Sequence, residues 1–99
     1  MWYTFKAPDK RRPVLIITRT SAISFLNALT IAPITTTIRD IPSEVFLTHE
    51  DGLFTNCAAN LDNLQTVPKS QLDGLITTLS TLRMQEVNQA LAFALGMDT

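Results

Sequence analysis

Hydrophobic and β-branched residues form two long runs in the first half of the chain. Residues 13–18 are almost continuously apolar or β-branched, which is typical of a strand buried on both faces and predicts the centre of a sheet. Residues 29–38 also have strand composition, but Pro33 cannot donate to a sheet ladder, so we expect an edge position or a bulge there. Residues 2–5 favour a further strand, and turn-forming residues follow it.

The second half of the chain alternates short strand-like segments with turn residues. The strand-like segments are residues 44–47, 54–59, 63–67 and 75–79. A turn that ends at Gly52 separates the first two of these segments. Residues 68–74 begin with proline and end with glycine, which predicts a short helical turn before the last strand.

Only one stretch has the spacing of a long helix, and it begins near Leu82. Apolar residues at helical spacing share one face: Met84, Val87, Leu91, Ala94 and Leu95. Ser80 is placed to cap the first turn, with Leu79 and Met84 forming a hydrophobic staple around it. Gly96 stands where a helix commonly ends. The sequence therefore predicts a mainly β (β+α) protein, a small β barrel whose open side the C-terminal α-helix covers.

Chain length and amino-acid composition restrict the class of protein. With 99 residues, the chain has room for a single domain, expected over residues 1–99. A hydrophobic fraction of 45% with 17% charged residues excludes a chain that is disordered throughout. Cys57 is the sole cysteine and cannot form an internal disulfide, and no signal peptide or membrane-spanning apolar run is recognisable. We therefore expect a cytoplasmic protein.

Charge is distributed unevenly along the chain, although the net charge is only −1. Residues 1–19 hold five basic side chains and one acidic side chain, a balance of +4. The remaining residues hold three basic and eight acidic side chains, a balance of −5. Such a dipole could direct one face towards a polyanion. The alternative is a basic, solvated loop between two strands.

Three blocks of sequence together resemble the MazF/PemK family of toxin-antitoxin ribonucleases. They are KRRPVLII at residues 10–17, APITTTIR at 32–39 and DNLQTVPKSQL at 62–72, and residues 91–96 (LAFALG) resemble the closing segment of the family. The resemblance implies an SH3-like barrel of the CcdB/PemK/MazF type. It also implies a homodimer with an RNA groove and, as partner, a cognate antitoxin with an acidic disordered tail.

The implied activity is that of a sequence-specific endoribonuclease that cleaves single-stranded RNA. A ribose 2′-hydroxyl attacks the adjacent phosphate and leaves a 2′,3′-cyclic phosphate, a reaction that requires no metal and no cofactor. By matching position, the resemblance implies Arg12 and Thr35 as catalytic residues. The residues expected to bind RNA are Lys10, Arg11, Thr36, Arg39, Asn63 and Gln65.

The chemistry of Arg12 supports this role independently of the resemblance. The residue before a proline is held in an extended conformation, so Pro13 fixes the direction in which the Arg12 side chain starts. A guanidinium is planar, permanently charged and able to donate to two phosphate oxygens at once. It suits stabilisation of charge on phosphorus, or proton donation, better than proton abstraction. Thr35 offers a hydroxyl that can donate to a phosphate oxygen.

The chain departs from the family pattern at Gln65, where some relatives carry an arginine. A neutral amide cannot replace that charge, so the expected catalytic mechanism depends more strongly on Arg12. The start of the chain and the loop after its first strand are also short, so contacts made by that loop in relatives are not transferred. We read His49 as a solvated turn residue, Cys57 as an inert strand residue, and Trp2 with Tyr3 as packing residues.

Two other functions share this type of fold. A gyrase-poisoning toxin of the CcdB type would bind its target without catalysing a reaction, but its relatives carry a tryptophan near the C-terminus and this chain does not. A catalytically silent RNA-binding homologue is favoured by the missing arginine at Gln65. Phe93 points away from the apolar face of the helix, and we expect it to contact the second subunit of a dimer.

Overall fold

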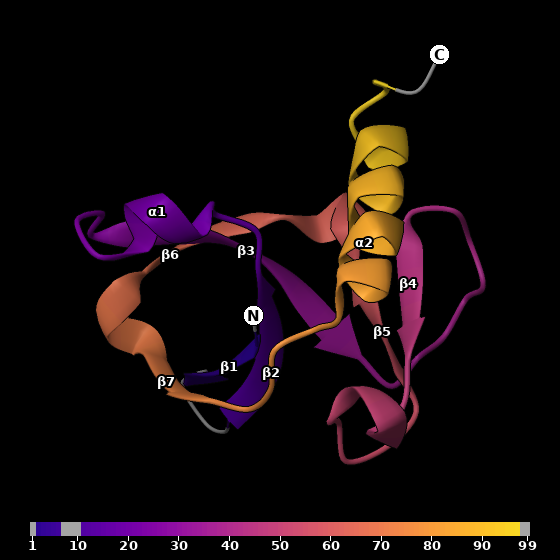
Figure 1. Cartoon of the computed structure of the whole chain (residues 1–99), viewed down its shortest axis with the longest axis horizontal. Helices are drawn as coiled ribbons and strands as arrows, with labels where there is room; N and C mark the ends of the chain where they lie inside the picture. Colours follow the sequence, from indigo (N-terminus) through magenta and orange to yellow (C-terminus); the bar gives the residue numbers. More distant parts are fainter. Residues whose placement is uncertain (1, 7–10, 98–99) are drawn as a thin grey trace.

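The structure is a computed structural model that describes residues 2–6 and 11–97, except for the side chains of residues 2–6, 11, 20 and 73. Seven strands are described: β1 (Trp2–Lys6), β2 (Arg11–Ile16), β3 (Ala28–Thr35), β4 (Glu44–Leu47), β5 (Cys57–Asn60), β6 (Gln65–Pro68) and β7 (Leu72–Leu75). The α-helices are α1 (Thr20–Ile23) and α2 (Thr81–Ala94). Three 3-10 turns are η1 (His49–Asp51), η2 (Leu61–Asn63) and η3 (Lys69–Gln71). Figure 1 shows α2 standing over the end of the sheet formed by β4 and β5.

All of the described strand pairs are antiparallel, and the strands follow the order β4-β5-β3-β2-β1-β7, with β6 also paired to β3. The predicted β+α class, an antiparallel sheet with a C-terminal helix, is confirmed. The predicted small barrel does not close, because among the described residues the end strands β4 and β7 do not pair with each other. The sheet is therefore an open path of strands.

Strand β3 is the longest strand and connects the two halves of the sheet. One of its edges pairs with β2 through residues 31–33. On the other edge, residues 28–31 pair with β6, and Ile34 and Thr35 pair with β5. On this edge, Pro33 lies between the residues that pair with β6 and those that pair with β5, and no pairing is described for it there. The expected edge position is wrong, because β3 has partners on both sides. The expected irregularity is found instead as a break in the pairing on one side of Pro33, where no ladder donor is required.

Strand β2 separates two hydrophobic cores. Leu15 is fully buried in the larger core, which β4, β5 and α2 also supply. Val14 and Ile16 point to the opposite face and pack with Leu29 and Ile31 of β3. Side chains alternate across a strand, so a continuous apolar run serves both cores at once. The prediction of a strand buried on both faces is confirmed.

Helix α2 forms as the sequence predicts. The Ser80 side chain accepts a hydrogen bond from the Arg83 N–H at 3.2 Å, and Val87 and Ala90 are buried against β4 and η2. Leu79 and Met84 belong to the same core, as expected for the staple. Gly96 follows the helix with a φ of 72°, a conformation that suits glycine.

Several predicted boundaries are wrong. The sequence analysis does not predict helix α1, and β5 begins at Cys57 rather than at residue 54. The last predicted strand, residues 75–79, is extended only as far as Leu75, because β7 begins earlier and pairs with β1.

None of the helices in the described part of the chain combines the length and hydrophobicity that a bilayer-spanning helix needs.

Candidate functional site

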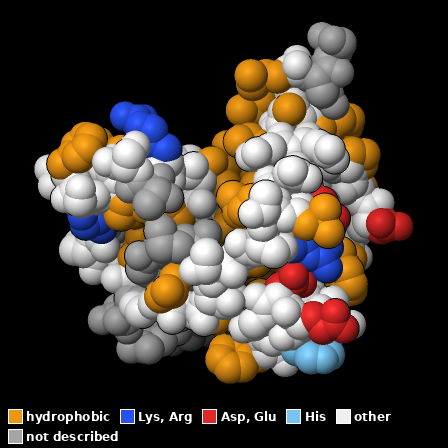
Figure 2. All heavy atoms as spheres, in the orientation of Figure 1, with side chains coloured by type: hydrophobic (Ala, Val, Ile, Leu, Met, Phe, Trp, Pro, Cys, Tyr) orange, Lys and Arg blue, Asp and Glu red, His pale blue; other side chains and the backbone are white. Residues whose placement is uncertain are grey.

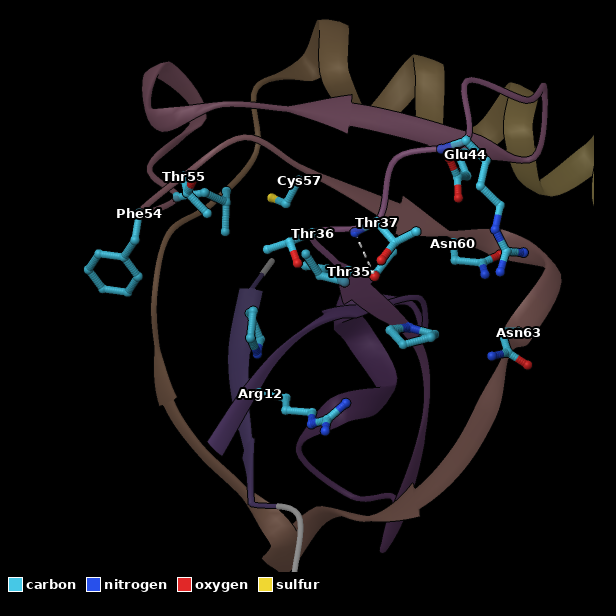
Figure 3. Close-up of a pocket in the computed structure, with 15 residues that line it drawn as sticks. Arg12, Thr35, Thr36, Thr37, Glu44, Phe54, Thr55, Cys57, Asn60 and Asn63 are labelled. Carbon is cyan, nitrogen blue, oxygen red and sulfur yellow. Dashed lines mark hydrogen bonds between the residues drawn. The ribbon is translucent and has the colours of Figure 1, made fainter. Parts of the chain in front are cut away.

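A cavity of about 550 Å³ opens where β2, the end of β3 and the segment before β5 converge. Its size lies within the range of about 300–1,000 Å³ that is usual for ligand sites. Segments distant in sequence line it: Arg12, Pro13, Pro33, Ile34, Thr35, Thr36, Thr37, Arg39, Glu44, Leu53, Phe54, Thr55, Cys57, Asn60 and Asn63. Figure 3 shows Arg12 extending from β2 into the open centre, with Thr35, Thr36 and Thr37 across from it.

Arg12 and Thr35 reach this cavity because of the pairing between β2 and β3. Val14 pairs with Pro33, so residue 12 of β2 and residue 35 of β3 lie just beyond the end of that pairing. Beyond Pro33, β3 pairs with β5 on its other edge and continues without β2 beside it. Arg12 is exposed, and its side chain lines the cavity instead of being buried in the core.

The hydroxyl of Thr35 is oriented by the backbone of Thr37. Its Oγ1 accepts a hydrogen bond from the Thr37 N–H at 3.0 Å, the contact drawn in Figure 3. This bond uses a lone pair of the oxygen and leaves the hydroxyl hydrogen free to donate. The half-buried Thr35 side chain is therefore suited to donate to an anionic oxygen in the cavity.

Arg39 and Glu44 are linked at the cavity wall. The Arg39 N–H donates to Glu44 Oε1 at 2.9 Å, across a turn in which Asp40 has a φ of 54°. Among the described lining residues, Arg12 and Arg39 are the cations and Glu44 is the one acid. The formal charge of this lining is therefore +1, two basic side chains less one acidic side chain, which favours an anionic ligand.

Two asparagines supply amide groups to the same wall. Asn60 Oδ1 accepts the Asp62 N–H at 3.0 Å and so caps η2, which ends at Asn63. The buried Ser43 donates its hydroxyl to Asp62 Oδ2 and holds the same turn from the other side. These bonds leave the side-chain N–H groups of Asn60 available as donors towards the cavity.

The cavity includes five of the residues that the sequence analysis selected: Arg12, Thr35, Thr36, Arg39 and Asn63. Gln65 is exposed on β6 opposite Ile31, before the part of β3 that borders the cavity, and it does not contribute to the lining. Lys10 lies outside the described residues, and the side chain of Arg11 is not described. The assigned functions of all eight residues stay predictions.

Sequence reasoning did not select Glu44, Phe54 or Asn60 for this site. Glu44 and Asn60 are paired directly across β4 and β5, which only the fold reveals. The signal that could have drawn attention to Phe54 is a large aromatic between the turn at Gly52 and polar Thr55 and Asn56.

Cys57 also lines the cavity, but its chemistry is that of a packing residue. It is buried, and burial together with the nearby negative charge of Asp51 raises the pKa of its thiol. A neutral thiol is a weak nucleophile. His49 lies in η1, exposed and away from the cavity lining, as expected for a turn residue. Among the described residues, no group of three or more His, Cys, Asp or Glu side chains is arranged to hold a metal ion.

This fold, an antiparallel sheet with one C-terminal helix, is that of solved toxin structures. The solved structure of the Mycobacterium tuberculosis toxin MazF-mt6 superposes with a TM-score of 0.90 at 33% sequence identity, covering 100% of both chains. An endoribonuclease in complex with its cognate antitoxin, from Mycobacterial species, superposes with a TM-score of 0.86 at 28% identity, covering 99% of this chain and 93% of that one.

Sequence comparison gives the family itself. The family model of the PemK-like, MazF-like toxin of type II toxin-antitoxin systems matches residues 3–95. The protein named endoribonuclease MazF3 from Mycobacterium tuberculosis is 37% identical over 91% of this chain and 87% of its own length. The chain belongs to the PemK/MazF-like toxin family of type II toxin-antitoxin systems.

Proposed function

We propose that this toxin is a sequence-specific endoribonuclease that cleaves single-stranded RNA in the cavity between Arg12 and Thr35. The observation that carries the proposal is that an exposed guanidinium and a hydroxyl with a free hydrogen line one cavity of net positive charge. Relatives over nearly the whole chain are named endoribonucleases, which supports the same activity here.

The proposed reaction uses a nucleophile that the substrate itself contains, so no metal is needed to generate one. The ribose 2′-oxygen bonds to phosphorus while the bond from phosphorus to the 5′-oxygen breaks. The products are a 2′,3′-cyclic phosphate and a 5′-hydroxyl end. The proton from the 2′-hydroxyl passes to water, and the departing 5′-oxygen takes up a proton in turn. Negative charge builds on the phosphate oxygens as the new bond forms, and this charge requires stabilisation.

Arg12 supplies that stabilisation in our proposal. A guanidinium is a planar cation that can donate to two phosphate oxygens at once, so Arg12 suits binding of the transition state better than abstraction of a proton. Thr35 donates its hydroxyl hydrogen to a phosphate oxygen. This hydrogen is free because the Thr37 N–H bonds to a lone pair of the hydroxyl oxygen. The Thr37 N–H holds the Thr35 oxygen before the substrate arrives, which favours electrostatic catalysis by this hydroxyl.

Substrate binding is assigned to the remaining polar groups of the site. Arg39 provides the second described cation of the cavity, and Thr36 and Asn63 provide donors for phosphates or base edges. Lys10, Arg11 and Gln65 keep their sequence-based assignment as RNA contacts outside the described lining. A neutral residue at position 65 leaves Arg12 and Arg39 to neutralise the backbone near the scissile phosphate.

We propose that the chain acts in the cytoplasm as a homodimer whose activity a cognate antitoxin controls. The antitoxin would place an acidic disordered tail along the cationic cavity and so compete with RNA for Arg12 and Arg39. Support comes from the related endoribonuclease whose structure, at 28% identity, is a complex with its cognate antitoxin.

The test is cleavage of a long RNA by the pure protein in excess chelator. The expected products carry 2′,3′-cyclic phosphate ends at a short recurring sequence, found by mapping the 5′ ends. Arg12→Ala should lower kcat by about 100- to 1,000-fold, as removal of an oxyanion donor does, while circular dichroism stays unchanged. Unchanged cutting by that variant would refute the role of Arg12. RNA binding without any cutting would favour the catalytically silent homologue, and inhibition of gyrase supercoiling would favour the CcdB-type alternative.

A further inference from the structure

One aromatic side chain at the rim of the candidate cavity is almost fully exposed. Phe54 is 92% exposed, the highest value among the large hydrophobic residues that the structure describes. It lines the same cavity as Arg12 and Thr35 and is the one aromatic among the described lining residues. In Figure 3 its ring extends outward from the rim, away from the core.

The local structure holds Phe54 in this position. The neighbouring Leu53 is 6% exposed and belongs to the main core, and Cys57, three residues further on, is 3% exposed in the same core. The short segment between these two anchors therefore has little freedom to turn Phe54 inward. The protein thus presents an exposed apolar ring, on a segment anchored at both ends, beside a cationic cavity.

We propose that Phe54 is a stacking platform for a base of the RNA, next to the nucleotides that flank the scissile phosphate. This inference rests on the proposed endoribonuclease function and deepens it. Single-stranded RNA exposes its base faces, and an aromatic ring can stack on such a face whatever the base. Arg12 and Thr35 act on the phosphate, whereas Phe54 holds a neighbouring base. Phe54 therefore contributes to affinity and to the register of the strand, and not to the chemical step.

The first measurement compares binding of an RNA that cannot be cut. The substrate is a short RNA whose cut position has been mapped with the wild-type protein, with the attacking 2′-hydroxyl replaced by hydrogen. Fluorescence anisotropy should show Kd raised roughly 5- to 150-fold in Phe54→Ala, the range for loss of one base–aromatic stack. Phe54→Trp should restore binding, and Phe54→Leu, which keeps an apolar side chain without a π face, should not.

The second measurement identifies the stacked base. Single abasic sites are placed in turn along the same RNA, and each is bound to the wild-type protein and to Phe54→Ala. At one position, removal of the base should abolish the difference between the two proteins, because the stack then lacks one of its members. At saturating RNA, kcat of Phe54→Ala should stay within about twofold of wild type, since the transition-state contacts are intact.

A matched control is Phe25→Ala. Phe25 is also exposed, at 68%, but it does not line the cavity, so its removal should leave Kd unchanged. Equal Kd for the wild type and Phe54→Ala, or no abasic position at which the difference disappears, would overturn the proposal. A Phe54→Ala variant that loses only dimerisation or antitoxin binding would assign the ring to a protein contact instead.

The outcomes also separate this inference from the proposed function. If the wild-type protein cuts RNA and Phe54→Ala binds it equally well, the stacking platform alone fails. If the wild-type protein cuts no RNA, the proposed function fails. Anisotropy is then measured with a random-sequence RNA pool, and equal affinity of the two proteins for that pool overturns the stacking platform as well.

Discussion

Arg83 Nε lies 2.9 Å from Asp51 Oδ1, and this ion pair connects helix α2 to the turn η1. The same guanidinium donates to Glu86 Oε2 at 2.9 Å, one turn further along the helix. Figure 2 shows acidic side chains and the histidine gathered at the η1 end of the molecule, with hydrophobic side chains exposed along α2. The ion pair thus holds the N-terminal end of α2 against η1, the turn that precedes the cavity-lining residues Leu53, Phe54 and Thr55.

The Asp51 carboxylate predicts a pH dependence of stability. Burial opposes its ionisation, but the hydrogen bond from the Thr48 N–H and the ion pair with Arg83 outweigh this, so the pKa of Asp51 is lowered. A lowered pKa in the folded state contributes stability above the unfolded value of about 3.9, and that contribution is lost as the pH falls through this value and below. Asp51→Asn should lower the free energy of unfolding at pH 7 by about 1–3 kcal/mol.

Urea titrations at pH 7 and pH 3 check this prediction. The deficit of Asp51→Asn should be smaller at pH 3, because below about pH 3.9 the wild-type carboxylate takes up a proton in the unfolded state more readily than in the folded state. A deficit equal at both pH values would show that the ion pair contributes nothing.

Gly52 is predicted to be irreplaceable for two separate reasons. Its φ of 98° is a conformation that residues with a Cβ rarely adopt, and an added Cβ would lie 2.5 Å from Thr77 Oγ1. Gly96→Ala is the matched control, because its φ of 72° is also positive but nothing lies within 4 Å of the added Cβ. Thermal melts should show a larger fall in Tm for Gly52→Ala than for Gly96→Ala. Equal falls would mean that Thr77 moves aside freely.

The Thr35 hydroxyl is predicted to act in the chemical step. Thr35→Val removes the donor while keeping the shape, and it should lower kcat by about 10-fold or more with little change in Kd for uncut RNA. Thr35→Ser keeps the hydroxyl and should recover most of the rate. Single-turnover cleavage under chelation measures both variants. If Thr35→Val cuts as fast as wild type, the hydroxyl is only a structural group of the turn at Thr37.

The exposed apolar groove beside α2 is predicted to be a contact between two copies of the chain. Phe93 of α2 and Phe46 of β4 are each 46% exposed and line one groove, together with Ile38 and Ile41. Apolar side chains gathered on one face are typical of an interaction surface. In sedimentation equilibrium, Phe93→Asp should shift the protein towards monomer, whereas Phe25→Asp, away from this groove, should leave it dimeric. A fully dimeric Phe93→Asp would place the dimer contact elsewhere.

Local patterns in the sequence determined several elements directly. The continuous apolar run at residues 13–18 predicted that β2 is buried on both faces. Side chains of a strand alternate between its two faces, so an uninterrupted apolar run places apolar side chains on both. The spacing of apolar residues with Ser80 at the start predicted α2, because helix periodicity and capping act within a few residues. The resemblance to the family motif selected Arg12, which lines the cavity, and its position before Pro13 supports an extended start of that side chain.

The tertiary structure alone decided which distant segments meet. It placed Pro33 in a gap between two partners of β3, brought Glu44 and Asn60 together across β4 and β5, and left Gln65 outside the cavity. It also set Phe54 at the rim by anchoring the residues on either side in the core. Strand register and the choice of strand partners depend on contacts between residues far apart in the chain. The residue pattern within one segment does not determine these contacts.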